Sequence, residues 1–169
     1  MNAFNQNLME IANAEEGVEE KPRGSNRGPR VDDYQRATWL ETHQWGPWCA
    51  AFVCWCIMAT MHARGMKNTA TFKRPRTAGA KDFRRWSLEQ GNETHTLDIP
   101  GRDIQRSDIV IYRYPHIGLA DSAPDAKGFL WVVEGNTNED GGREGYEVCR
   151  RRRHFSEIAT RIRINEIPQ

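Results

Sequence analysis

The most apolar stretch of the chain is Trp45-Gly-Pro-Trp-Cys-Ala-Ala-Phe-Val-Cys-Trp-Cys-Ile-Met-Ala-Thr60. A Gly-Pro-Trp turn opens this stretch, and the apolar run that follows predicts a buried helix over residues 49–64. Cys49 falls where the turn becomes the helix. A thiol there feels the positive end of the helix dipole and the unpaired amides of the first turn, which favour the nucleophilic thiolate. The stretch therefore indicates a cysteine hydrolase in which Cys49 is the nucleophile.

The length and composition indicate a single domain without a membrane span. The chain has 169 residues, of which 38% are hydrophobic, and its formal net charge is +1. Because this net charge is close to zero, it favours neither nucleic acid nor a membrane surface as a partner. No run approaches the ~20 apolar residues that a membrane span requires. The N-terminus has no basic segment followed by an apolar one, so we expect synthesis in the cytoplasm without a signal peptide. We also expect a monomer.

The four cysteines are expected to be reduced. Cys49, Cys54 and Cys56 lie on one predicted helix, where the thiols either diverge or, for Cys49 and Cys56, stand about 10 Å apart along the axis. These pairs do not meet disulfide geometry, and the same divergence argues against a zinc site. The loop Asp140–Gly145 lacks the carboxylate spacing of a calcium loop. We expect no metal or cofactor, and we expect Cys54 and Cys56 to be core residues.

Helical patterns precede strand patterns along the chain. The predicted helices cover residues 4–16, 32–40 with Asp32 or Asp33 as N-cap, 49–64 and 78–89. The predicted strands cover residues 108–114, 116–120, 129–133, 146–152 and 160–164. Residues 1–48 would then form N-terminal helices and a loop, and residues 104–166 an antiparallel sheet on which the nucleophile helix packs. This order favours an α+β fold.

His116 is the best-placed general base among the five histidines. It follows Pro115 and begins a predicted strand, and a strand end can hold a side chain rigidly over a helix terminus. The next predicted strand leads into Val133-Glu-Gly-Asn136, where a carboxylate or an amide would reach the far ring nitrogen of His116. A cysteine hydrolase needs such a base and such an orienting group. The residues therefore predict a Cys49, His116 and Glu134 triad, with Asn136 as a competing or supporting orienter.

Four segments of the chain form a specific ordered series. They are Ser25-Asn-Arg-Gly-Pro-Arg-Val31, Gly46-Pro-Trp-Cys-Ala-Ala-Phe-Val53, Ser107-Asp-Ile-Val-Ile-Tyr112 with His116-Ile-Gly118, and Val133-Glu-Gly-Asn-Thr-Asn138. In this order they resemble the CHAP family, the cysteine- and histidine-dependent amidohydrolases/peptidases, and especially its compact phage and bacterial members. The resemblance covers residues 10–153 and implies one papain-like catalytic domain over residues 1–169. Tyr114-Pro115 before His116 departs from many relatives, so the rim of the cleft is expected to differ.

The resemblance implies that the protein cleaves an amide bond of peptidoglycan through a thioester intermediate. It assigns Cys49 as the nucleophile, His116 as the base and Glu134 as the third member. An amidase and an endopeptidase both remain open, so the expected partner is a peptide stem or a cross-bridge. Without a signal peptide, action in the periplasm or cell wall requires a holin, a phage tail or a secretion system, and an immunity protein could accompany it. The alternatives are a non-catalytic papain-like binding module and an amidohydrolase that acts on a substrate outside the wall.

Other polar and aromatic residues have weaker assignments. Backbone amides at the start of the nucleophile helix are the natural oxyanion donors, and His43 or Gln44 is a candidate side-chain donor. Trp48 and Tyr114 are candidates for the wall of the substrate cleft. For the basic run of residues 150–153, strand alternation predicts that Arg151 and Arg153 share a solvated face, against the alternative that the run binds an anionic polymer.

Overall fold

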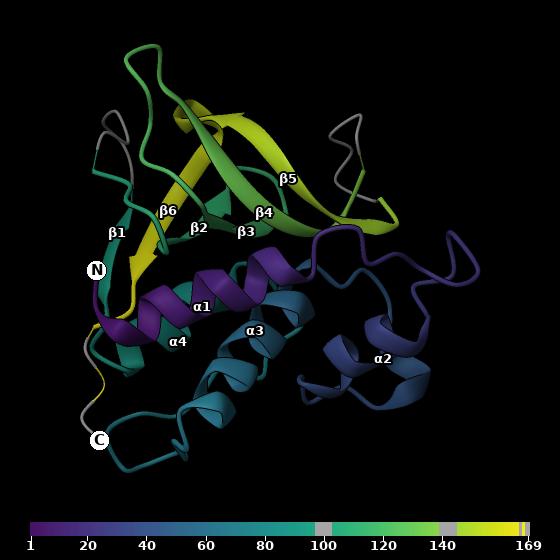
Figure 1. Ribbon diagram of the computed structural model, residues 1–169. Helices are drawn as coiled ribbons and strands as arrows, with labels where there is room; N and C mark the ends of the chain where they lie inside the picture. The colour runs from purple at the N-terminus through teal and green to yellow at the C-terminus, as the bar shows by residue number, and fades with distance from the viewer. Residues whose placement is uncertain (97–102, 139–144, 166, 168–169) are drawn as a thin grey trace.

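Helices occupy the first half of the chain and most strands the second half in the computed structural model, which describes residues 1–96, 103–138, 145–165 and 167 (Figure 1). The helices are α1 (Ala3–Ala14), α2 (Pro29–Arg36), α3 (Cys49–Ala63) and α4 (Asp82–Glu89), with short 3-10 helices η1 (Thr42–Gln44) and η2 (Phe155–Glu157). The strands are β1 (Glu93–Thr96), β2 (Ile109–Tyr112), β3 (Ile117–Ala120), β4 (Phe129–Thr137), β5 (Glu147–His154) and β6 (Ile158–Arg163).

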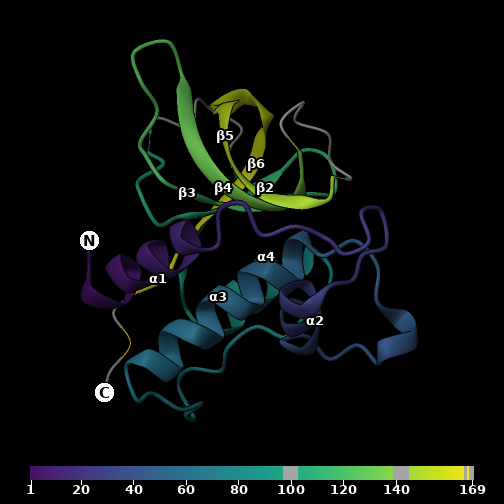
Figure 2. The same cartoon turned by 45° about the vertical axis from the view of Figure 1, so that its right-hand side comes forward.

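The strands form one curled antiparallel sheet above the helices. Its order is β1-β6-β2-β3-β4-β5, and each neighbouring pair runs antiparallel. In Figure 2 the helices lie on one side of this sheet, and α3 passes below β3 and β4, which it contacts. The predicted α+β class is confirmed, and the helix that begins at Cys49 packs on the sheet.

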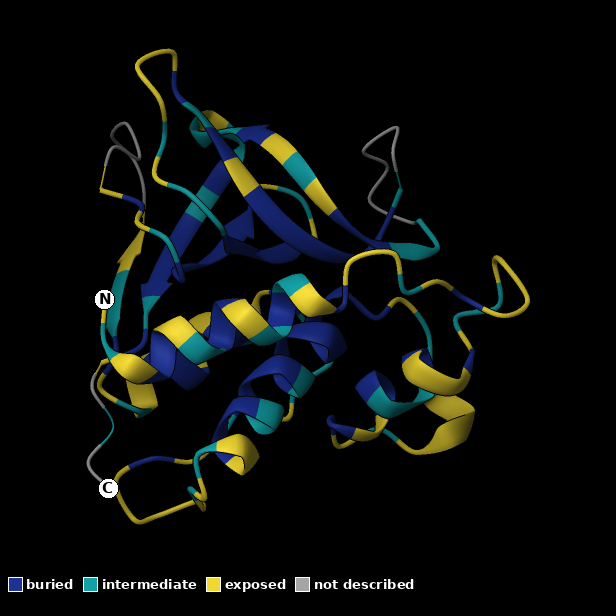
Figure 3. Cartoon of the chain, viewed as in Figure 1, coloured by how far each residue is buried: buried dark blue, intermediate teal, exposed yellow. Residues whose placement is uncertain are grey.

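The first two turns of α3 form the centre of the larger core. Each residue from Cys49 to Cys54 is buried, and so is Cys56 (Figure 3). Helices α1 and α2 also pack against α3, so helices cover this helix as well as β3 and β4, which explains why the sequence of α3 is apolar on every face. Cys54 and Cys56 are core residues as predicted, and all four cysteines carry free thiols.

The curl of the sheet encloses a second, smaller apolar cluster on the face away from α3. Side chains alternate between the two faces of a strand, so Val133 packs in the core around α3 while Leu130 and Val132 pack in the smaller cluster with Tyr112. Glu134 follows the same alternation and projects on the face of Val132. The Glu134 side chain therefore lies on the same face as the smaller apolar cluster.

The start of α2 corrects one prediction. The sequence predicted Asp32 or Asp33 as the N-cap, but the helix begins at Pro29 with Gly28 as the N-cap. Proline suits the first helical position because its missing N–H would have no intrahelical partner. Asp32 instead accepts a hydrogen bond from the Gly28 amide at 3.2 Å and pairs with Arg27. The carboxylate thus stabilises the first turn from within the helix.

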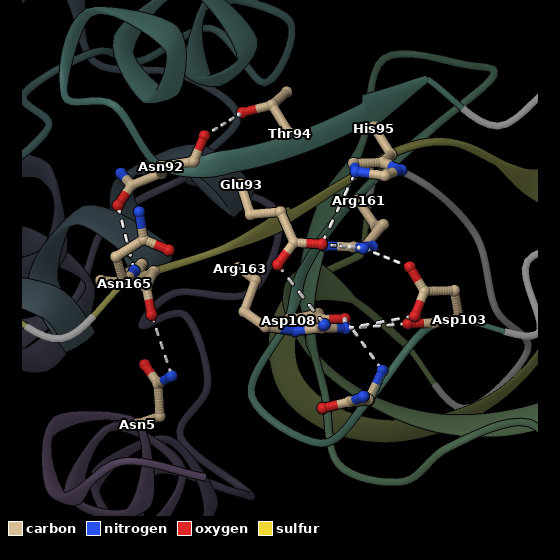
Figure 4. Close-up of polar contacts among 12 residues, drawn as sticks. Asn5, Asn92, Glu93, Thr94, His95, Asp103, Asp108, Arg161, Arg163 and Asn165 are labelled. Carbon is tan, nitrogen blue, oxygen red and sulfur yellow. Dashed lines mark hydrogen bonds and ion pairs between the residues drawn. The ribbon is translucent and has the colours of Figure 1, made fainter.

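Strand β1 was missed by the sequence patterns. Its residues Glu-Thr-His-Thr carry no apolar alternation, and ion pairs accompany its pairing with β6 (Figure 4). The fully buried Arg161 on β6 bonds Glu93 on β1 at 2.5 Å, and it also bonds Asp103. Arg163 holds the buried Asp108 through two hydrogen bonds of 2.8 Å. These pairs couple β1 and the segment before β2 to β6.

Candidate active site

Cys49 is the first residue of α3 and is 7% exposed. The preceding Gly-Pro-Trp turn is held by Gln35, a buried residue of α2 whose Nε2 donates to the Gly46 carbonyl at 2.6 Å. Trp48 occupies the N-cap, and an indole has only a donor, so it cannot cap amides. The first amides of a helix have no intrahelical acceptor. The thiol therefore lies beside donors that suit a developing negative charge.

His116 and Glu134 meet on adjacent strands. His116 directly precedes β3, Glu134 lies on β4, and both side chains are fully buried. The ring Nε2 lies 2.9 Å from Glu134 Oε2. Gly118 permits this approach, because a Cβ atom at that position would lie 2.8 Å from Glu134 Cγ and 2.6 Å from a methyl group of Val132. A direct hydrogen bond thus joins His116 and Glu134, the second and third members of the predicted triad. Of the two candidates for orienting the ring at Nε2, Glu134 and Asn136, it is Glu134 that makes this bond.

A second glycine brings α3 against β4. A Cβ atom at Gly135 would lie 2.7 Å from Phe52 Cβ and 2.8 Å from the Trp48 ring. Both contacts are closer than real Cβ atoms tolerate, so a larger residue would push the helix away from the strand. The glycine after Glu134 therefore allows the N-terminus of α3 to approach the strand that carries the carboxylate.

Cys49 lies close to the His116 ring. Nε2 is engaged by Glu134, and the buried Nδ1 makes no well-formed hydrogen bond with the described residues. Cys49 is nevertheless close enough to raise the pKa of the ring. Because Nε2 is engaged by Glu134, we infer that Nδ1 is the ring nitrogen on the side of the sulfur and that the two atoms lack hydrogen-bond alignment. Apo active sites often hold catalytic contacts in this looser form.

The charges of this group favour a protonated histidine beside an ionised glutamate. Burial alone lowers the pKa of His116, but contacts with Cys49 and Glu134 outweigh it and raise the pKa to about 9. Burial raises the pKa of Glu134, but hydrogen bonds from Arg153 and His116 outweigh it and lower the pKa to about 2. Near neutral pH, His116 is therefore an imidazolium that can give a proton to a leaving group.

Two residues that the sequence analysis did not place in the site also bond Glu134. Tyr112 Oη donates to Oε1 at 2.5 Å. Arg153 donates from Nε to Oε1 at 2.9 Å and from Nη2 to Oε2 at 2.6 Å. The contacts of Glu134 on β4 therefore involve the three neighbouring strands as well: Tyr112 lies on β2, Gly118 on β3 and Arg153 on β5.

The position of Arg153 corrects the prediction for the basic run. Arg151 and Arg153 do share a face of β5, but that face lies inside the curl, where Arg153 is buried and covers the Tyr112 ring. The exposed arginines are Arg150 and Arg152, which pair with Asp121 and Asp125. Alternation was correct, and the assignment of the solvated face was wrong because the sequence does not reveal how a sheet curls.

The other predicted site residues lie in different environments. Tyr114 is partly buried and stacks on the His116 ring at 6.2 Å between centroids. Trp48 is fully buried and donates to Glu20 at 2.8 Å, so it is a core residue rather than cleft wall. Asn136 is buried with a positive φ of 57° at the irregular end of β4.

His43 and Gln44 lie in the exposed 3-10 helix η1. Gln44 Oε1 accepts a hydrogen bond from the Glu41 amide at 3.0 Å, so its carboxamide stabilises that turn. The arrangement assigns neither residue to the oxyanion position, and the backbone amides of α3 are the better candidates.

The comparisons with known proteins add no assignment. No protein-family model matches the chain, and a search of curated proteins finds no significant match. Within the described residues, no group of three or more histidine, cysteine, aspartate or glutamate side chains is arranged to hold a metal ion. None of the helices in this part of the chain has the length and apolar character that crossing a bilayer requires.

Proposed function

We propose that the protein is a cysteine amidohydrolase with a papain-like fold, in which Cys49, His116 and Glu134 form the catalytic triad. The observation that carries this proposal is the 2.9 Å bond between His116 Nε2 and Glu134, together with the closeness of the His116 ring to Cys49 at a helix N-terminus. A nucleophile, a base and an orienting group in this relation are the constellation that acyl transfer requires. The helix-on-sheet arrangement and the central position of α3 agree with the proposed fold.

In the proposed reaction, the Cys49 thiolate attacks an amide carbonyl while His116 carries the proton at Nδ1. The tetrahedral oxyanion accepts hydrogen bonds from first-turn amides of α3. His116 then protonates the leaving amine, and the carbon–nitrogen bond breaks to leave a thioester. The neutral His116 next removes a proton from water, which attacks the thioester and releases the acid. Glu134 holds the ring in position and stabilises its charged form throughout.

The substrate that we propose is an amide bond in the peptide part of peptidoglycan, either where the stem joins the glycan or within a stem or cross-bridge. The support is the ordered set of sequence segments that resembles the CHAP family. Mass spectrometry of muropeptides released from purified sacculi distinguishes the two cleavage positions, because amidase action frees intact stems from the glycan.

The Cys49→Ala variant tests the proposal. We expect the wild-type protein to release muropeptides from sacculi and the Cys49→Ala variant to release none, with an unchanged circular dichroism spectrum. The control is Cys54→Ala, which removes a buried thiol five residues along the same helix and should retain activity. Muropeptide release by a folded Cys49→Ala variant would exclude Cys49 as the nucleophile.

A second candidate function is a non-catalytic binding module with the same fold. The limited exposure of Cys49, 7%, favours it because a nucleophile must be reached by its substrate. The rate of Cys49 alkylation by iodoacetamide as a function of pH discriminates between the two. A rate that depends on the proton of a histidine supports the enzyme, and an ordinary thiol profile supports the binding module.

A further inference from the structure

We propose that Arg153 is a positioning residue that, together with Tyr112, keeps Glu134 ionised and fixes its orientation toward His116. This inference rests on the proposed function, because it concerns the third member of the same triad. Arg153 comes from the edge strand β5, two strands away from the strand that His116 precedes. It reaches Glu134 across the inside of the curled sheet and contacts both carboxylate oxygens.

The hydrogen bonds of Glu134 fix the direction of proton exchange. A carboxylate has about four acceptor positions, and Tyr112, Arg153 and His116 fill four of them on the two oxygens. An arginine is always a donor. Because the carboxylate is held as an acceptor by Arg153 and Tyr112, His116 must donate from Nε2. The proton exchanged with sulfur therefore resides on Nδ1, the ring nitrogen on the side of Cys49.

Arg153 also supplies the counter-charge that a buried carboxylate needs. The Glu134 side chain is fully buried and that of Arg153 is 9% exposed, so solvent offers little stabilisation of the charge. The described titratable groups that face the pair are Cys49 on α3, Tyr112 on β2, Tyr114 before β3, Cys149 and Arg153 on β5 and Glu157 on η2. Among them, Arg153 is the fixed cation. Glu157 reaches it only at 3.9 Å from a half-exposed position.

The charge and the fork geometry of Arg153 have separable effects. If Arg153 is neutralised, the pair of Glu134 and His116 holds the imidazolium proton on Nδ1 more tightly, because a positive charge beside the pair is gone. The proton then leaves at higher pH. A lysine at this position keeps the charge but cannot make two parallel hydrogen bonds. A residue that only stabilised the fold would not move the pH of this step.

The test measures Cys49 alkylation by iodoacetamide between pH 4 and 11, with the labelled peptide quantified by mass spectrometry. The rate should rise in two steps, the upper one marking loss of the proton from His116. We expect Arg153→Gln to move the upper step to higher pH by about one unit or more, and Arg153→Lys to leave its position near that of the wild type. The matched control, Arg151→Gln, changes an arginine two residues away on the same face and should have no effect.

Two outcomes would overturn the proposal: a folded Arg153→Gln variant with the upper step of the wild type, or an equal shift in Arg151→Gln. If Arg153→Gln does not fold, the double variant Glu134→Gln/Arg153→Gln removes both buried charges. Its upper step should fall below that of the wild type, since His116 has lost its anion, and an unmoved step would refute the role of the pair. Because alkylation needs no substrate, this result stands independently of whether sacculi are cleaved.

Discussion

At the residue scale, Glu134 determines how His116 holds its proton. Its contact and its charge are among the causes that raise the pKa of His116 to about 9, against the effect of burial. The amide of a Glu134→Gln variant can still accept from Nε2, so this change removes the charge while it keeps an acceptor. The Glu134→Gln variant therefore tests the charge of Glu134 separately from its hydrogen bond to His116.

We expect Glu134→Gln to lower turnover at neutral pH roughly 10²-fold or more and to move the alkaline limb of the pH–rate profile to lower pH. The reason is that the imidazolium loses its anionic partner. The measurement is kcat as a function of pH on solubilised peptidoglycan fragments. Glu157→Gln is the control, because Glu157 is a partly exposed carboxylate that reaches Tyr114 and Arg153 but not His116. An equal loss in both variants would contradict a specific role for Glu134.

The sequence could single out Cys49, His116 and Glu134 for the candidate site because each follows a local signal. These signals are a turn before an apolar helix, a strand start and a strand end. Arg153 has no such signal. It lies in a run of four arginines that looks like a solvated strand, and its burial depends on the curl that brings β5 over Tyr112. Long-range geometry of this kind is not encoded in any one segment.

At the scale of elements, the site depends on the close approach of α3 to β4 at Gly135. Phe52 and Trp48 occupy the space that a side chain at this position would need. The two elements carry the proposed nucleophile and the carboxylate that bonds His116, so the distance between them affects how the thiol lies relative to the His116–Glu134 pair. A change of packing here should affect activity as well as stability.

We expect Gly135→Ala to reduce the free energy of unfolding by about 1–3 kcal/mol, the usual cost of overpacking a core, and to lower kcat further than this loss alone explains. Urea unfolding and turnover at a temperature where the variant remains folded provide the two measurements. Gly46→Ala is the matched control, because a Cβ atom at Gly46 would meet nothing within 4 Å. Wild-type turnover in Gly135→Ala would show that the approach is not required.

The elements that the sequence predicted well are those with apolar periodicity. Helix α3 and strands β2, β3 and β5 lie close to their predicted ranges, whereas β4 begins as predicted at Phe129 and continues beyond residue 133 to Thr137. Strand β1 was missed because its pairing is accompanied by the ion pairs of Arg161 and Arg163 rather than by apolar side chains. Helix α2 begins before its predicted range because Pro29 occupies the first turn, where proline is favoured, whereas the prediction relied on Asp32 or Asp33 as the N-cap.

At the scale of the whole molecule, the buried pair of His116 and Glu134 links stability to pH. The pKa of His116 is raised from an ordinary 6.5 to about 9, so its stabilising contribution is complete below pH 6.5 and is lost as the pH rises through 9. Glu134 has a lowered pKa, so its contribution is present above pH 4.5 and is lost as the pH falls toward 2. Between pH 4.5 and pH 6.5 both residues therefore contribute to the stability of the fold.

We therefore expect the free energy of unfolding to fall between pH 6.5 and 9 in the wild type and to fall less steeply in His116→Gln, which has no group to deprotonate there. Urea denaturation followed by tryptophan fluorescence at half-unit pH intervals measures both slopes. The exposed His95 offers a control in His95→Gln, whose slope should match that of the wild type. Equal slopes in the wild type and His116→Gln would contradict the linkage.

Strand β6 follows β5 in the chain but lies between β1 and β2 in the sheet. Strands β2 to β5 can form a meander from neighbouring segments, whereas β1 and β2 share no edge until β6 enters between them. Contacts between segments distant in sequence slow folding, and an unfilled strand position exposes backbone groups that a second chain can pair with. Refolding at high protein concentration should therefore yield dimers in which β6 is exchanged between two chains, while dilute refolding yields monomers.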